Sequence, residues 1–190
     1  MSRQEEIENK VMEFAAQKLE CAVKQITDYY KEHDAEIKED FFRAIGHGLQ
    51  QCVESKKKIG FITISILESS MITKTYDLQI AFSNAYLYAD DNPVYEYWAP
   101  SFIYNYLDSD IEEMERSLKD QVIRLNPYEV LGLKRQYVTN LYFLIGFMMK
   151  GMAPEIAGLC KYQETDREKI VKVLFGKYME KQTEICSLGA

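Results

Sequence analysis

The spacing of apolar residues changes at Ile59, and this change limits the chain to folds that contain both helices and strands. Before Ile59, apolar residues recur in steps of three and four, which is the period of an amphipathic helix. From Ile59 to Leu67 the chain is rich in β-branched residues, and isoleucines alternate with small polar residues. This pattern is typical of a strand with one buried face. The sequence therefore predicts an α+β fold.

Two further segments have strand character, and no helical pattern separates them. Residues 76–83 alternate apolar and polar side chains, and residues 94–98 follow a turn-forming sequence at residues 90–93. Strands that are joined by short turns pair antiparallel. We therefore expect a mainly helical α+β protein, in which five or six helices pack with a small antiparallel β-meander over about residues 59–98.

Helices are predicted on both sides of the expected meander. One long helix covers residues 2–31, and a second begins at the N-cap candidate Asp34. Capping-box patterns mark three more helix starts, at residues 109–112, 126–129 and 165–168. Helices should resume near Pro100, and the helix with the first capping box should carry an apolar stripe from Ile111 to Leu125. The last helix should contain residues 170–179. The tail from Gln182 is expected to fray.

Length and composition favour one ordinary globular domain over residues 1–190. The chain has a mass of 22.2 kDa, with 47% hydrophobic and 28% charged residues. Its four cysteines are scattered, which is typical of free thiols in a reducing compartment. We find no signal-peptide pattern and no apolar run near the roughly 20 residues that a membrane span needs. These features predict a cytoplasmic protein without a membrane partner.

The negative charge of the chain is concentrated in its middle. Twenty-three basic and 30 acidic residues give a net charge of -7, and residues 75–115 contain no Lys or Arg. The acidic residues of this segment are Asp77, Asp90, Asp91, Glu96, Asp108, Asp110, Glu112, Glu113 and Glu115. Because a negative field repels phosphate, sequence-independent binding of nucleic acid is not expected.

The same segment is rich in aromatic residues, including Tyr104 and Tyr106. Tyr and Trp combine a large rigid contact area with a polar tip, and acids around them would attract a basic partner. We therefore predict an acidic, tyrosine-rich surface around residues 86–106 for a protein partner with a basic surface, or for self-association. The predicted partner-binding residues are Tyr88, Asp90, Asp91, Tyr95, Tyr97 and Trp98. An alternative left open by the sequence is that these aromatic rings pack into the core.

Enzyme activity is a competing interpretation, which the sequence favours less. His47 lies between Gly46 and Gly48, and such a histidine could serve as an acid–base group in a pocket between helices and sheet. No nucleotide-binding or hydrolase motif occurs, and the histidines and cysteines lack the close pairing of zinc ligands. The sequence therefore predicts no cofactor, no metal and no catalytic residue with a clear pattern. A small-ligand site near His47 remains the alternative to an interaction module.

Overall fold

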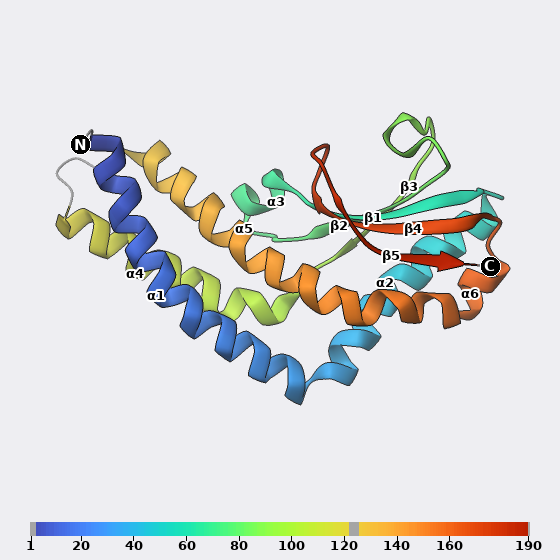
Figure 1. The fold of residues 1–190 in the computed structure, drawn as a ribbon, viewed down its shortest axis with the longest axis horizontal. Coiled ribbons are helices and arrows are strands. Elements are labelled where there is room, and N and C mark those ends of the chain that lie inside the picture. The colour runs from blue at the N-terminus through green and yellow to red at the C-terminus, as the bar shows by residue number, and fades with distance from the viewer. Residues whose placement is uncertain (1–2, 122–125, 190) are drawn as a thin grey trace. The chain divides into compact units, whose positions relative to one another are not determined.

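The chain divides into two compact units, each built from two separate stretches of sequence. The computed structural model describes residues 3–121 and 126–189 (Figure 1). The first unit contains Met1–His33 and Ser101–Leu144, and the second contains Asp34–Pro100 and Ile145–Ala190.

The first unit is helical in its described part. Its elements are α1 (Arg3–Glu32), α4 (Ser101–Gln121) and the first part of α5 (Pro127–Met152). Between α1 and α4, the rings of Tyr29 and Phe102 stack with centroids 6.2 Å apart. Between α4 and α5, the hydroxyl of Tyr137 donates a hydrogen bond to the carboxylate of Asp110. Burial raises the pKa of Tyr137, and the hydrogen bond to Asp110 adds to this effect, so its hydroxyl stays protonated and keeps donating.

The predicted helices of this unit are present, with different boundaries. The long N-terminal helix is confirmed, and Ala22 and Ile26 are buried on it. At the start of α5, the backbone N–H of Asn126 donates to the Glu129 carboxylate at 2.7 Å, as a capping box requires. By contrast, α4 already begins at Ser101, so residues 109–112 lie inside a helix and do not start one. The last residues of its predicted apolar stripe, Val122 and Leu125, lie outside the described residues.

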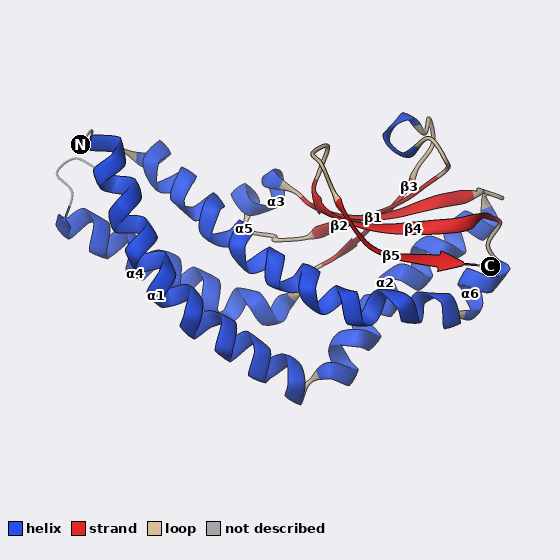
Figure 2. Cartoon of the chain, viewed as in Figure 1, coloured by secondary structure: helices blue, strands red, loops and turns tan. Residues whose placement is uncertain are grey.

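The second unit contains a five-stranded sheet in the order β3-β2-β1-β4-β5 (Figure 2). Its elements are α2 (Asp34–Glu54), β1 (Ile59–Ile66), α3 (Glu68–Thr73), β2 (Leu78–Ser83), the 3-10 helix η1 (Leu87–Ala89), β3 (Val94–Trp98), the last part of α5, the 3-10 helix η2 (Ala153–Gly158), α6 (Cys160–Glu164), β4 (Arg167–Lys177) and β5 (Thr183–Gly189). β4 pairs parallel with β1, and the other neighbouring pairs are antiparallel.

The prediction of a small antiparallel meander is wrong, although a mixed α+β fold holds. The three strands over residues 59–98 exist, but residues 167–177 form a strand and not a helix, and the tail from Thr183 is a strand that pairs with it. The misleading signal was the capping-box pattern at residues 165–168. The hydroxyl of Thr165 donates back to the carbonyl of Lys161, at the end of α6, and the carboxylate of Glu168 pairs with Lys58. Neither side chain caps a helix start.

One face of the sheet packs against helices and is apolar. We call it the helix face; it carries Ile62, Ile64, Phe82, Val173 and Phe175, which are buried. The close approach of α2 occurs at Gly48, where an added Cβ would lie 2.0 Å from the ring of Phe82. The last part of α5 approaches in the same way at Gly146, against Phe175. Glycine is therefore required at these two positions by packing.

We predict that Gly48→Ala destabilises the protein by about 1–3 kcal/mol, because the buried ring of Phe82 has little room to move. Gly46 is the matched control: it lies on the same helix, and no atom lies within 4 Å of its added Cβ. Gly46→Ala should stabilise by about 0.5–1 kcal/mol through helix propensity alone. Urea unfolding of both variants measures the two changes. Stabilisation by both substitutions would contradict the packing argument.

Candidate binding surface

Four tyrosines gather on the side of the sheet opposite the helix face. Tyr95 and Tyr97 alternate along β3 with residues that face the helices, Tyr178 directly follows β4, and Tyr88 lies in η1. Their side chains remain between 41% and 53% exposed. We call this side of the sheet, with these four residues, the tyrosine face.

Tyr88 and Tyr178 connect two loops that are far apart in sequence. Their rings meet edge to face with centroids 6.4 Å apart. Burial raises the pKa of Tyr88. It also raises the pKa of Tyr95, and the neighbouring Tyr178, Tyr97 and Asp90 add to that effect. Because both pKa values lie above the ordinary value of a phenol, Tyr88 and Tyr95 stay neutral hydrogen-bonding groups at neutral pH.

Among the residues that the strands carry on this face are four buried polar ones, beside the apolar Phe61, Ala81 and Leu174. Thr63, Ser65, Gln79 and Ser83 occupy this face, and all four are buried. Gln79 lies between Ser65 of β1 and Tyr97 of β3 in the strand register. Its side-chain amide donates to the Tyr97 hydroxyl at 3.4 Å. We call these four buried, uncharged side chains the polar floor of the tyrosine face.

Gln182, from the turn between β4 and β5, reaches over this floor. An added Cβ on Gly176 would meet the Cα of Gln182 at 3.2 Å, so the turn folds directly onto the end of β4. The Gln182 amide nitrogen donates to the Ser65 hydroxyl at 2.8 Å. The side-chain oxygens of Gln79 and Gln182 are both buried and accept no hydrogen bond in the described part of the chain. A buried acceptor without a donor costs about 1–3 kcal/mol, so these two oxygens call for an explanation.

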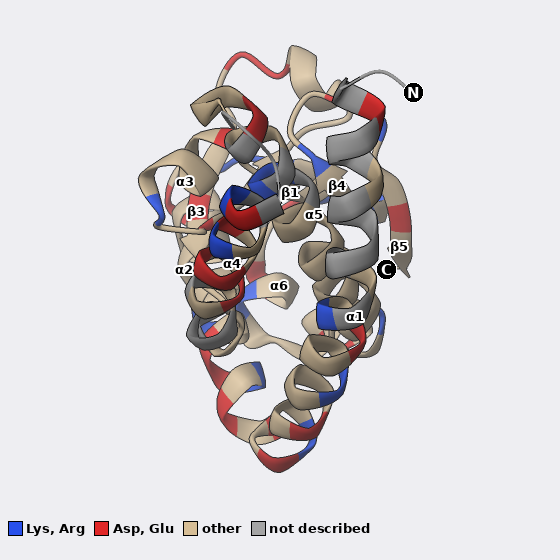
Figure 3. Cartoon of the chain, turned by 90° about the vertical axis from the view of Figure 1, so that its left-hand side faces the viewer, with Lys and Arg blue, Asp and Glu red and all other residues tan. Residues whose placement is uncertain are grey.

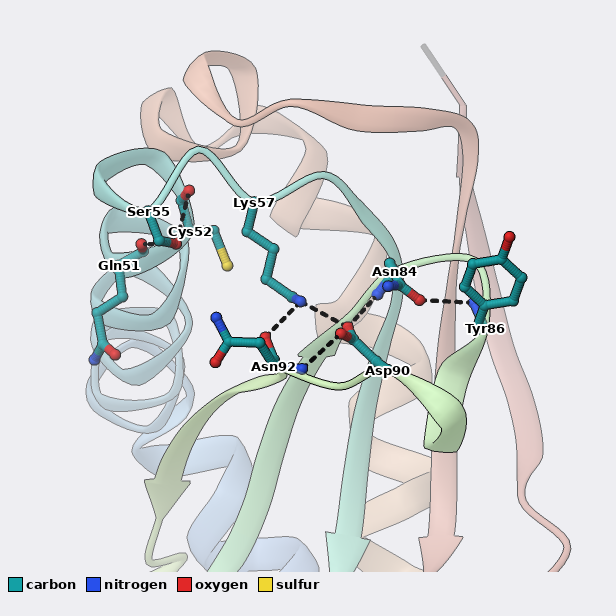
Figure 4. A network of polar contacts seen from close by, with 8 residues as sticks. All are labelled: Gln51, Cys52, Ser55, Lys57, Asn84, Tyr86, Asp90 and Asn92. Atoms are coloured by element: carbon teal, nitrogen blue, oxygen red, sulfur yellow. Dashed lines mark hydrogen bonds and ion pairs between the residues drawn. The ribbon is translucent and has the colours of Figure 1, made fainter.

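A buried ion pair fixes the loop that carries Tyr88 (Figure 4). Lys57 donates to the Asp90 carboxylate and to the carbonyl of Asn92, both at 2.6 Å. The same carboxylate accepts the backbone N–H groups of Asn84 at 2.7 Å and Asn92 at 3.0 Å. Burial opposes ionisation of Asp90, but these donors outweigh it and hold the pKa of Asp90 below its ordinary value. Asp90 therefore shapes the loop from within.

Cys52 lies beside this ion pair and is not a nucleophile in this environment. Burial raises the pKa of its thiol to about 12, and the nearby Lys57 only partly offsets that effect. Because the thiolate is the reactive form, a thiol that is protonated at neutral pH does not start covalent chemistry. The polar contacts drawn in Figure 4 therefore have a structural role, because they hold the loop of Tyr88 in place.

The structure separates the residues that the sequence grouped as one surface. Tyr88, Tyr95 and Tyr97 lie together on the tyrosine face, and Asp91 is exposed on the loop next to it. Trp98 is buried on the helix face, where its indole N–H donates to Asp40 at 3.1 Å. The acids of α4 belong to the first unit (Figure 3), and the side chains of Tyr104 and Tyr106 lie outside those described.

Sequence reasoning missed Tyr178, Gln79 and Gln182. The alternation of Val171, Val173 and Phe175 was a signal that could have placed residues 167–177 in the sheet, and with them Tyr178. His47, the alternative site residue, is exposed on α2. Within residues 3–121 and 126–189, no three His, Cys, Asp or Glu side chains cluster as metal ligands would, and no helix has the length and apolar character to cross a membrane.

Both loops that meet on the tyrosine face contain a residue in the left-handed backbone region. Leu87 precedes Tyr88 and has φ 53°, and Met179 follows Tyr178 and has φ 59°. This conformation costs a residue with a side chain roughly 1–2 kcal/mol. The fold thus accepts backbone strain on both sides of the Tyr88–Tyr178 contact, a kind of strain that is concentrated at functional sites in proteins.

We predict that Asp90→Asn lowers the free energy of unfolding at neutral pH. We also predict that this free energy falls less steeply in the variant than in the wild type as the pH is lowered. Because the folded-state pKa of Asp90 lies below the ordinary 3.8, its stabilisation is present above that value and is lost as the pH falls through the folded pKa. Unfolding of wild type and variant between pH 7 and pH 3 measures this difference. Asp91→Asn is the control, since Asp91 is exposed, and should follow the wild type. If the stability of Asp90→Asn fell with acid pH as steeply as that of the wild type, the stabilising role of the Asp90 carboxylate would be contradicted.

We predict that Met179→Gly stabilises the protein by about 0.5–1 kcal/mol. Glycine removes the left-handed strain but costs more chain entropy on folding, so the gain is smaller than the strain itself. The Met179 side chain is 63% exposed, so little packing is lost. Met179→Ala keeps the strain and serves as the control, with no gain expected. Equal stability of the Ala and Gly variants in chemical denaturation would show that the backbone is unstrained here.

Comparison with known proteins gives no relative from which a role could be transferred. The chain matches no protein-family model, no curated protein and no solved structure. The function must therefore be argued from the tyrosine face and its surroundings.

Proposed function

We propose that the protein is an interaction module that binds a partner protein through the tyrosine face. The observation that carries this proposal is that four half-exposed tyrosines from three separate segments lie on one face of one sheet. Half-exposed tyrosines offer contact area at a low cost in side-chain entropy, because each has only two side-chain torsions to fix. Such residues carry much of the binding energy in protein interfaces.

A partner with a basic surface fits the charge around this face. From residue 75 to residue 100 the second unit has no Lys or Arg, but it has four acids, Asp77, Asp90, Asp91 and Glu96. Of these, Glu96 lies on the helix face, where Gln51 of α2 donates to its carboxylate. Lys57 pairs with Asp90, which leaves Asp91 as the exposed acid on the loop of Tyr88. In this proposal the tyrosines supply contact, while Asp91 and the net charge of -7 accelerate the approach of a cationic surface.

The competing interpretation, a catalytic site at His47, gains no support from the geometry. His47 is exposed on α2, and the close approach at this helix is made by Gly48 against Phe82, which fills the space with packed side chains. Cys52 is a protonated thiol at neutral pH. We therefore propose binding and not catalysis.

Replacing Tyr95 and Tyr97 together by alanine should abolish partner binding and leave the fold intact. Loss of an interface hot spot costs at least about 2 kcal/mol, so capture of a genuine partner should fall by more than about 30-fold. The experiment compares proteins retained from a lysate by immobilised wild type and variant, quantified by mass spectrometry.

Tyr128→Ala is the matched control, because Tyr128 is 72% exposed but lies at the start of α5 in the first unit. Proteins lost with the double variant and retained with Tyr128→Ala are the expected result. If the double variant retained the same proteins as wild type, the proposed function would be refuted.

A further inference from the structure

We propose that the tyrosine face holds an anchor site for one arginine side chain of the partner, between the side chains of Gln79 and Gln182. This inference rests on the proposed function and gives the partner a specific chemistry. Its starting observation is the pair of buried side-chain oxygens that accept no hydrogen bond in the described part of the chain.

The hydrogen bonds of the Gln182 amide nitrogen fix the orientation of the side-chain amide, so its oxygen remains available as an acceptor. Its amide nitrogen lies 3.4 Å from the carbonyl oxygen of Lys177, which can only accept a hydrogen bond, and 2.8 Å from the Ser65 hydroxyl. The nitrogen must therefore point toward these two groups, and the amide oxygen must point away from them. The group that completes Gln182 has to be a donor.

Gln79 presents a second acceptor on the same floor. Its amide nitrogen donates to the Tyr97 hydroxyl, and its oxygen has no donor. Ser65 lies between the two glutamines: it pairs with Gln79 in the strand register and accepts the hydrogen bond of Gln182. The two unfilled acceptors thus belong to one polar row across the sheet.

A guanidinium group matches these requirements. It carries five N–H donors and no acceptor, whereas a hydroxyl or an amide would bring its own acceptor to be satisfied. Its planar cation also stacks on tyrosine rings, and Tyr97 lies directly against the row through its contact with Gln79. Because these rings are about half exposed, the charge would stay partly hydrated and would not need a buried carboxylate.

Entry of the side chain requires only local movement. Both oxygens are shielded in this structure, so side chains around them must move before a guanidinium can reach them. Tyr97 contacts Gln79 and is about half exposed, so rotation of its ring is one route. Exposed side chains change rotamer within nanoseconds, so this step does not limit binding.

The test uses three short probes, acetylated Gly-Arg-Gly amide and its citrulline and lysine counterparts, titrated against the full chain. Citrulline keeps the shape of arginine but is neutral and has lost one donor group. We expect saturable shifts of the Gln79 and Gln182 side-chain amide signals in nuclear magnetic resonance spectra. For a single anchor, the dissociation constant should be on the order of 1 mM. Binding of the citrulline probe should be at least about tenfold weaker.

Gln182→Met should remove these shifts, and Gln163→Met, which changes an exposed glutamine on α6, should not. Gln182→Ala provides a second variant at the turn if methionine disturbs the fold. Equal binding of the citrulline or lysine probe, or unchanged arginine binding in both Gln182 variants, would overturn the anchor site.

The outcomes also separate this inference from the proposed function. Loss of partner capture with the Tyr95 and Tyr97 variant, together with no arginine binding, would overturn the anchor and leave the interaction surface. Arginine binding without any loss of capture would overturn the proposed function and leave a free arginine site.

Discussion

The parallel pairing of β4 with β1 is the constraint on which the rest of the second unit depends. It places the C-terminal segment beside the central strand, in register from Phe61 with Lys172 to Ile66 with Lys177. A parallel neighbour cannot be reached by a tight turn, so the chain first completes β2, β3 and the long helices before it returns. Tyr178 and Gln182 reach the tyrosine face only because of this return.

The two faces of the sheet differ in chemistry, and this difference explains why one of them stays available. On the helix face, Gly48 of α2 and Gly146 of α5 let these helices approach the phenylalanine rings of the strands closely. This contact buries the apolar face. The opposite face carries Ser65 and Gln79 at positions that pair directly. A helix packed there would have to satisfy these polar groups, so tyrosines with polar tips are the better cover.

Local sequence patterns correctly predicted the elements whose structure depends on neighbouring residues. They failed where pairing with a segment distant in sequence determines the structure. The long first helix, the start of α5 and the three strands up to Trp98 follow from periodicity and from the Asn126 cap. Residues 165–168 resemble a helix start, but pairing with β1 and the Lys58–Glu168 ion pair make the following residues a strand. Of the candidate surface, alternation along β3 could place Tyr95 and Tyr97, whereas the burial of Trp98 and Asp90 depends on α2 and on Lys57.

The roles of Asp90 and Asp91 show why composition alone overstates an acidic surface. Two neighbouring carboxylates contribute equally to the charge of the sequence, yet Asp90 is only 3% exposed and is neutralised by Lys57, whereas Asp91 faces solvent. A buried ion pair contributes almost nothing to the field that a partner senses, because its two charges cancel at short range. Charge then guides the approach through few groups, and recognition must come from the tyrosine rings and from the unfilled acceptors between them.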